Sequence, residues 1–241
     1  MPSPRNPYSA TRFCLLLGVA LLAPVALYLL WVLGWWITFT IDDLMHPRPE
    51  PRTIWEAARD GNFEVLNREL EKGADPNAPD PQWGEVPLNW AAMDSDEDRA
   101  EIIKRLLRAG ADPNYGAPLV QAAASCNTAV TKELLTGGAD TSQTVVGGWT
   151  ALHYASMNDC VDVMQLLIAA GADLNVRSDQ GLTPLIWAAE TAKVDAVRVL
   201  LEAGADRSIT DNKGRTAYDA ASITTGELAY WYRKVRKLLR E

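Results

Sequence analysis

The sequence predicts an all-α protein, a solenoid of stacked helix-turn-helix units preceded by a single transmembrane helix. Three observations lead to this fold class. Residues 13–41 contain no charged side chain. Beyond them the string Gly-Ala-Asp recurs five times, beginning at Gly73, Gly110, Gly138, Gly171 and Gly204. A second short string, such as TPLIWAA at Thr183, recurs in step with the first.

The composition and charge of the chain limit its classes of function. Of 241 residues, 48% are apolar and 22% are charged, which suits a chain with a packed core rather than a disordered one. Three cysteines are too few for a disulfide-rich scaffold, and two histidines exclude a histidine-rich metal centre. From residue 42 onward, 21 basic residues stand against 31 acidic ones. Such a surface repels phosphate backbones, so we expect no nucleic-acid partner.

The charge-free run 13–41 predicts a membrane anchor after a short N-terminal tail, 1–12. Its 29 residues exceed the roughly 20 that cross a bilayer core. Tryptophans near its end, at Trp31, Trp35 and Trp36, suit the headgroup level. A cleaved signal peptide is the alternative, but its apolar core spans only about 7–15 residues. An uncleaved single-pass anchor is therefore favoured.

The flanks of the anchor bear on its orientation. Arg5 and Arg12 precede the run and Asp42 and Asp43 follow it, which favours a cytoplasmic N-terminus and an array on the other side of the membrane. The composition and the anchor suit a bacterial inner-membrane protein with a periplasmic array. Basic residues soon after the run nearly balance this count, so a cytoplasmic array is the alternative. Residues 42–52 alternate proline with polar residues and predict a stiff, extended linker.

The recurring strings define the rest of the chain, 53–241. Successive Gly-Ala-Asp strings lie 37, 28, 33 and 33 residues apart, and a period near 33 indicates stacked helical hairpins. The second string reads VPLNWAA at Val86, APLVQAA at Ala117, TALHYAS at Thr150, TPLIWAA at Thr183 and TAYDAAS at Thr216. Together these strings resemble the ankyrin repeat family. The units fall at about 53–85, 86–116, 117–149, 150–182 and 183–215, followed by a C-terminal cap at 216–241.

Physical chemistry accounts for each part of a unit. The threonines that open the second string can cap the first helix, and the prolines that follow suit its first turn. The glycine of Gly-Ala-Asp ends the second helix in a left-handed conformation. An extended finger then leads to the next unit. No unit buries its own apolar face, so the array is stable only as a stack.

Two departures from the repeat are expected to alter its surface. Residues 93–99 add about three residues between the helices of the second unit, and the first finger is one residue longer than the fourth. The second finger is five residues short. We therefore expect a notch between units two and three.

The array shows no catalytic or metal-binding constellation. His153 lies in the TALH string, where the resemblance implies structural hydrogen bonds between units rather than acid–base chemistry. An acidic run at Asp94, Asp96, Glu97 and Asp98 lacks the glycine and spaced glutamate of a calcium loop, so a solvated insertion is the simpler interpretation. We expect no enzyme activity, no metal and no cofactor.

Aligned on the repeat, Cys126 and Cys160 fall at the turns between the helices of adjacent units. Neighbouring helices pack about 10 Å apart, whereas a disulfide needs Cα atoms within about 7 Å. Pairing is therefore geometrically marginal. In an oxidising compartment the two can form a disulfide, and the alternative is two separate thiols.

The resemblance also implies which residues contact a partner, because the fingers and the concave face of ankyrin arrays bind proteins. Trp90, Tyr154 and Trp187 share a position that is expected to face the core. The candidate partner-binding residues are Trp83, Met93, Asp94, Tyr115, Trp149, Met157, Asn158, Leu182, Glu190 and Thr191.

The C-terminal stretch ELAYWYRKVRKLLRE is basic and amphipathic. Leu228, Trp231, Val235, Leu238 and Leu239 are expected on its apolar side. A capping helix for the last unit is favoured over a helix that lies on anionic lipid. As a whole, the sequence predicts a non-catalytic, membrane-tethered module that holds, scaffolds or inhibits one protein partner. The acidic array predicts a basic or mixed patch on that partner.

Overall fold

The computed structural model describes residues 53–94, 98–221 and 229–240. The N-terminal tail, the predicted span 13–41 and the linker 42–52 lie outside these residues. Within the described residues, no helix combines the length and the apolar character needed to cross a bilayer. The anchor therefore stays a prediction from sequence.

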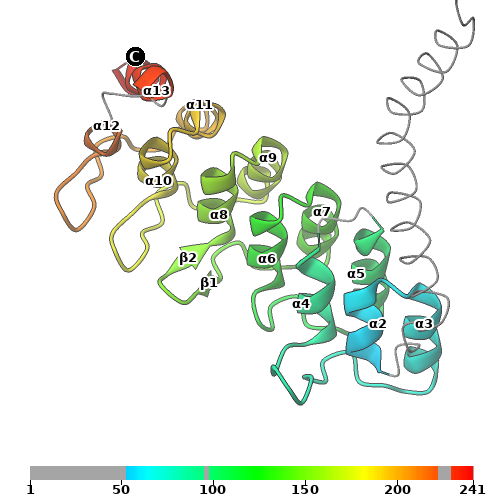
Figure 1. Cartoon of the computed structure of the whole chain (residues 1–241). Helices are drawn as coiled ribbons and strands as arrows, with labels where there is room; N and C mark the ends of the chain where they lie inside the picture. The colour runs from blue at the N-terminus through cyan, green and yellow to red at the C-terminus, as the bar shows by residue number, and fades with distance from the viewer. Residues whose placement is uncertain (1–52, 95–97, 222–228, 241) are drawn as a thin grey trace, which may run out of the picture. The chain divides into compact units, whose positions relative to one another are not determined.

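Consecutive helices pair into hairpins that stack along one direction (Figure 1). The pairs are α2 (Ile54–Asp60) with α3 (Phe63–Glu71), α4 (Pro87–Ala92) with α5 (Arg99–Arg108), α6 (Pro118–Ala124) with α7 (Thr128–Thr136), α8 (Ala151–Asn158) with α9 (Val161–Ala169), and α10 (Pro184–Glu190) with α11 (Val194–Glu202). Short α12 (Ala217–Ala220) and long α13 (Ala229–Arg240) close the stack. The first helices pack on one another in one layer, and second helices from α5 onward pack in another. The predicted all-α solenoid is confirmed.

The ends of the helices follow the sequence signals. Pro87, Pro118 and Pro184 open α4, α6 and α10, where no amide hydrogen is needed. Thr183 caps α10 by accepting a hydrogen bond from the Ile186 amide, and Thr216 caps α12 in the same way. Each Gly-Ala-Asp glycine has a left-handed backbone, with φ between +86° and +95°.

The core is repeated from unit to unit. A leucine four residues before each of the last four Gly-Ala-Asp glycines is fully buried, at Leu106, Leu134, Leu167 and Leu200. Paired alanines in the first helices are buried as well, and their small side chains let those helices approach closely. Because each face is covered only by its neighbour, every unit depends on the next for its core.

The fingers differ in form. In the third finger, β1 (Thr144–Val145) pairs antiparallel with β2 (Trp149–Thr150), a small strand pair that the prediction of an all-α fold did not include. Gly147 and Gly148 supply the positive φ angles of its turn. The second finger is a short turn, and the chain enters α6 from a left-handed Ala117.

The insertion in the second unit places an arginine between units one and two. Arg99 begins α5 and is buried, whereas Asp98, in the acidic run that was expected to be solvated, is exposed. Its guanidinium donates to the Ala58 carbonyl at 3.2 Å and pairs with Asp94 at 2.6 Å. It lies over Gly61, where a Cβ would collide with it. Asp96 and Glu97 lie outside the described residues.

A ladder of side chain–backbone bonds links successive fingers. Asn77 Oδ1 accepts from the Asp112 amide at 2.7 Å, Asn114 Oδ1 from the Asp140 amide at 2.8 Å, and Asn175 Oδ1 from the Asp206 amide at 2.8 Å. Each asparagine stands two residues after the aspartate of its own string. In the third finger that position is Ser142, whose side chain makes no such bond within the described part of the chain.

The C-terminal helix caps the array, as expected, but with a different buried side. Tyr232, Val235 and Leu239 are buried, and α13 packs against α11. Trp231 was expected on this side and is instead 45% exposed. At 100° per residue it points away from the stripe that its neighbour Tyr232 joins. The Tyr232 hydroxyl donates to the Glu190 carbonyl at 2.6 Å.

Candidate functional site

The exposed side of the first-helix layer, together with the fingers, is named here the inner face. It carries most of the residues predicted to bind a partner. Trp83 and Tyr115, in the first two fingers, are 67% and 50% exposed. Met93 follows α4 and is 40% exposed. Trp149 and Met157 are half-buried.

Several predicted residues already have structural partners. Asp94 pairs with Arg99, and Asn158 donates to the Ala124 carbonyl at 2.8 Å. Glu190 pairs with Arg215 at 3.2 Å. Thr191 bonds to the Trp187 carbonyl of its own helix. These interactions keep the side chains of the inner face ordered, so a partner would bind to a preformed surface.

Leu182 does not belong to the inner face. It is only 3% exposed, and its carbonyl accepts a hydrogen bond from the His153 ring. The prediction placed it among the partner-binding residues. The finger has already turned back into the stack at this point, because Leu182 directly precedes the cap Thr183.

The first feature of the inner face is an aromatic pocket of about 180 Å³. Its lining comes from the third finger, α8 and α10: Trp149, His153, Tyr154, Met157 and Trp187. The Trp149 and Trp187 rings lie 4.6 Å apart between centroids and are tilted by 58°. Tyr154 and Met157 share a side of α8 because they are three residues apart. The pocket has the size and apolar lining to take one side chain of a partner.

Tyr154 and Trp187 were expected to be core residues. They contact the core with one side and line this pocket with the other, so the prediction was wrong in part. An indole or phenol ring is too large to be covered by the alanines that fill the neighbouring positions. Trp90 likewise lines a pocket at the other end of the array.

His153 forms the floor of the aromatic pocket, and both of its ring nitrogens are engaged. Nδ1 accepts from the Thr150 amide at 3.2 Å, which leaves the proton on Nε2 to be donated to the Leu182 carbonyl at 2.9 Å. Burial lowers its pKa, and the Leu182 carbonyl opposes this only in part. The ring is therefore neutral and ties the first helix of unit four to Leu182, the residue directly before unit five.

A second pocket, the tryptophan pocket, lies at the N-terminal end and measures about 110 Å³. Its walls are Trp55, Trp83 and Trp90, with Arg59 at its border. Asp80 positions the walls, because its carboxylate accepts from the Trp83 amide at 2.6 Å and from Trp90 Nε1 at 2.8 Å. Burial acts to raise the pKa of Asp80, but these hydrogen bonds outweigh it and lower the pKa overall.

An open groove of about 480 Å³ adjoins the tryptophan pocket, between units one and three. Arg59, Trp90, Met93, Asp94 and Ser125 line it. Met93 and Asp94 were among the predicted residues, whereas Arg59 and Trp55 were not. Arg59 occupies the repeat position that Met93 and Met157 hold in later units, so its position was a usable signal, whereas the equivalents of Trp55 were not predicted to bind a partner.

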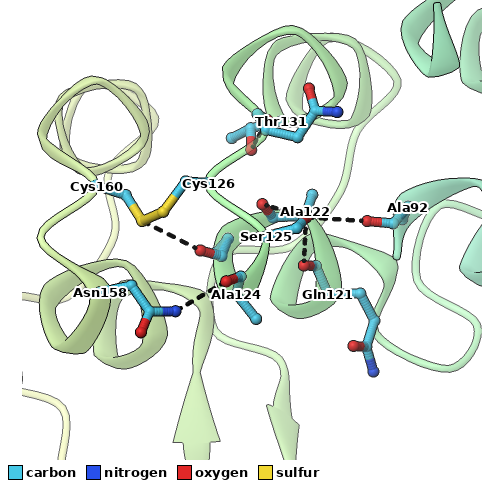
Figure 2. The surroundings of a disulfide bond; sticks show 11 residues. Ala92, Gln121, Ala122, Ala124, Ser125, Cys126, Thr131, Asn158 and Cys160 are labelled. Atoms are coloured by element: carbon cyan, nitrogen blue, oxygen red, sulfur yellow. Dashed lines mark hydrogen bonds between the residues drawn. A yellow bond between two sulfur atoms is a disulfide. The ribbon is translucent and has the colours of Figure 1, made fainter. Parts of the chain in front are cut away.

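Cys126 and Cys160 form a disulfide between units three and four, with their Cα atoms 5.4 Å apart (Figure 2). The estimate of about 10 Å applied to helix axes. Both cysteines lie instead in turns that reach toward each other. Cys126 adopts a left-handed conformation with φ of 56°, and Cys160 precedes α9. Beside the bond, Asn158 donates to the Ala124 carbonyl, which joins the same two units.

Among the described residues, no group of three or more His, Cys, Asp or Glu side chains is placed to hold a metal ion. His153 has no unused ring nitrogen for acid–base work.

Family models agree with this architecture. A model described as ankyrin repeats (3 copies) matches residues 54–144 and 95–178, and one described as ankyrin repeats (many copies) matches 167–221. The chain belongs to the ankyrin repeat family. None of the curated proteins compared with it matches. Ankyrin repeats are generally protein-interaction modules, and proteins built from them are typically non-catalytic.

Proposed function

We propose that this ankyrin array is a non-catalytic module that holds one protein partner on its inner face, tethered to the inner membrane by residues 13–41 and facing the periplasm. The observation that carries the binding role is the aromatic pocket. Trp149, Met157 and Trp187 offer large apolar surfaces at the junction of a finger and two helices. Aromatic residues in such pockets dominate the binding energy of many interfaces.

Charge determines the kind of partner. Residues 53–221 contain 14 basic and 26 acidic residues, a net charge of −12. A partner segment with one apolar side chain for the pocket and basic residues beside it complements this surface. Holding, scaffolding or inhibiting an envelope protein are all roles that such a contact can serve.

Two features support the periplasmic side. The bond between Cys126 and Cys160 suits an oxidising compartment, because cytosolic thiols are kept reduced. The charges that flank residues 13–41 point the same way. The alternative is the same module in the cytoplasm, where it recruits a soluble partner to the membrane.

A photocrosslinking amino acid at Met157 tests the binding face in living cells. We expect a discrete adduct from position 157 and none from position 165, since Gln165 is exposed on α9, away from the inner face. Trp187→Ala should remove the adduct, and Trp149→Ala with Met157→Ala should weaken capture of the identified partner by about 2 kcal/mol or more. Equal adducts at 157 and 165 count against the inner face.

Reporter fusions after Glu241 test the membrane side. A reporter active only outside the cytoplasm should be active, and one that fluoresces only inside should be dark. Trapping thiols in intact cells should find Cys126 and Cys160 protected from alkylation. The opposite pair of reporter results, with both thiols alkylated, selects the cytoplasmic alternative.

A further inference from the structure

The C-terminal cap carries a cationic pocket that the partner-binding role does not use. This pocket lies between α12 and α13, measures about 380 Å³, and is named here the cation pocket. Tyr218 of α12 forms one wall, and the other wall is Arg233, Arg236, Lys237 and Arg240 of α13. The spacings of three, four and seven residues place these cations on one side of a helix. Four positive side chains therefore border a single hollow.

Aromatic contacts hold two of the arginines in place. The Arg236 and Arg240 guanidinium carbons lie 4.7 and 5.1 Å from the centroid of the same Tyr218 ring. Arg240 also donates to the Tyr218 hydroxyl. Stacking on one ring keeps two like charges close together and ordered.

The cation pocket has a buried donor that lacks an acceptor. Arg236 Nε is buried and has no hydrogen-bond partner in the described part of the chain. Buried charged donors are normally satisfied, so this N–H indicates a site for an acceptor oxygen. Arg215, by contrast, is held by both Asp211 and Glu190.

The surrounding charges favour an anion. Residues 229–240 contain five basic residues and no acidic one. Asp219 is the acidic residue of α12. The hydrogen bonds that its carboxylate accepts from the Thr216 hydroxyl and amide lower its pKa most, and the charge of Arg236 contributes less, so Asp219 offsets only part of the positive charge of the pocket. The rest of the array is acidic, so its repulsion of anions makes this cationic end distinct.

We propose that the cation pocket binds a phosphate group, with Arg236 as the buried anchor and Arg233, Lys237 and Arg240 around it. Guanidinium groups match phosphate oxygens with paired, charge-assisted hydrogen bonds. The phosphate has two possible sources, a lipid headgroup and a free phosphate ion. Tyr230 and Trp231, which are 52% and 45% exposed, lie on the adjoining side of α13 beside Lys234. Exposed aromatic and basic residues together favour the lipid headgroup.

The first test titrates inorganic phosphate into the full chain in neutral detergent, with arginine labelled by ¹⁵N. We expect the Arg236 Nε–H resonance to shift and saturate with phosphate, and not with chloride at equal ionic strength. Arg236→Gln should weaken binding at least tenfold. Arg233→Gln should weaken it less and leaves the Tyr218 stack intact, so it serves if Arg236→Gln fails to fold.

Lys132→Gln is the matched control, since it removes one exposed cation from α7, outside the pocket. It should leave phosphate binding unchanged. An equal loss for Lys132→Gln and Arg233→Gln overturns the proposal, because it would mean diffuse attraction rather than a site. A shift that does not saturate overturns it as well.

The second test places the full chain in nanodiscs of phosphatidylcholine alone or with one third phosphatidylglycerol, and follows hydrogen exchange of residues 229–240. Slower exchange in the anionic discs, lost in Arg236→Gln, assigns the site to a lipid phosphate. Saturable binding of inorganic phosphate without a lipid effect supports the site and assigns it to a free ion. No effect in either test overturns the proposal. Neither readout involves the aromatic pocket, so this result is independent of the partner-binding proposal.

Discussion

The junction between units four and five and the junction between units three and four use different chemistry. At the first, His153 donates to the carbonyl of Leu182, the last residue before unit five, and Asn175 accepts from the Asp206 amide of unit five. At the second, Val120 stands at the histidine position and Ser142 at the asparagine position. Both polar links are therefore missing there, and the Cys126–Cys160 disulfide joins these two units instead.

The contrast shows that this array couples its units in more than one way. Apolar stacking is common to every junction, and polar links from two fixed positions fix the register of neighbouring units. The junction between units two and three keeps both links, with Asn89 donating to the carbonyl of Gly116, the last residue before unit three, and Asn114 accepting from the Asp140 amide. At the junction where neither the histidine position nor the asparagine position carries a linking side chain, a covalent bond joins the units. In a repeat protein, whose stability is a sum over units and interfaces, that junction is the expected breaking point.

The largest expected effect comes from cavities on opposite sides of that junction. Leu106→Ala and Leu167→Ala remove equivalent, fully buried side chains, and each should cost about 2–5 kcal/mol. With the disulfide intact, we expect either change to lower a single urea-unfolding transition. After reduction, Leu106→Ala should destabilise only units one to three and Leu167→Ala only units four and five. Hydrogen exchange of the two halves measures this. An equal loss of hydrogen-exchange protection in both halves after reduction would contradict a weak junction between units three and four.

Removing the disulfide tests the junction directly. Cys126→Ser with Cys160→Ser opens a bridge across 34 residues and should lower the free energy of unfolding by about 2–4 kcal/mol. The unfolding curve should also separate into two transitions, because only stacking, the Asn158–Ala124 hydrogen bond and the Asp179–Gly147 backbone bond then join the halves. A single transition, with an unchanged dependence of the unfolding free energy on urea concentration, would mean that this junction needs neither the disulfide nor the two missing polar links.

The sequence was sufficient to predict the repeat units but not the contacts between neighbouring units. Gly171 and its equivalents, the prolines and the capping threonines announce local structure, because each satisfies a backbone requirement within its own unit. The role of His153 also followed from its motif. The proximity of Cys126 and Cys160 did not, because it depends on how two turns lean across a junction. Trp187 and Trp231 were misplaced for a similar reason. Whether a large ring is covered depends on the neighbour, which one repeat does not specify.

The third prediction makes unit four resemble unit two. His153→Asn should keep a donor for the Leu182 carbonyl, as Asn89 does at its own junction. Asn89 has a buried Oδ1 that lacks a partner in the described part of the chain, so the exchange should cost about 1–2 kcal/mol at pH 7.5.

The same variant should change the pH dependence. Burial lowers the pKa of His153 in the folded chain, so the unfolded chain binds the proton first as the pH falls below about 6.5. The stability due to neutral His153 is thus complete above that pH and declines below it. The difference in unfolding free energy between the native chain and His153→Asn should shrink from pH 7.5 to pH 5.5. A constant difference would show that His153 titrates normally.

The smallest effect restores a missing polar link. The Ser142 amide donates to Asp140 Oδ1 at 2.8 Å, and the Asn114 and Asn175 amides donate to their own aspartates at 2.9 Å. The local turn is therefore the same in all three fingers, and an asparagine fits it. Ser142 and Asp173 are 31 residues apart, the spacing of the bonded pair Asn175 and Asp206.

Ser142→Asn should thus gain a bond to the Asp173 amide and about 0.5–1.5 kcal/mol of stability, measured by urea unfolding of the reduced chain, where the junction is weakest. Ser208→Asn is the matched control. Ser208 occupies the same place in the fifth finger, but no further Gly-Ala-Asp string follows it. If both variants gain equally, the asparagine acts within its own turn and the ladder is not a coupling between units. If only Ser142→Asn gains, and the two reduced transitions move closer together, a single side chain replaces part of what the disulfide supplies.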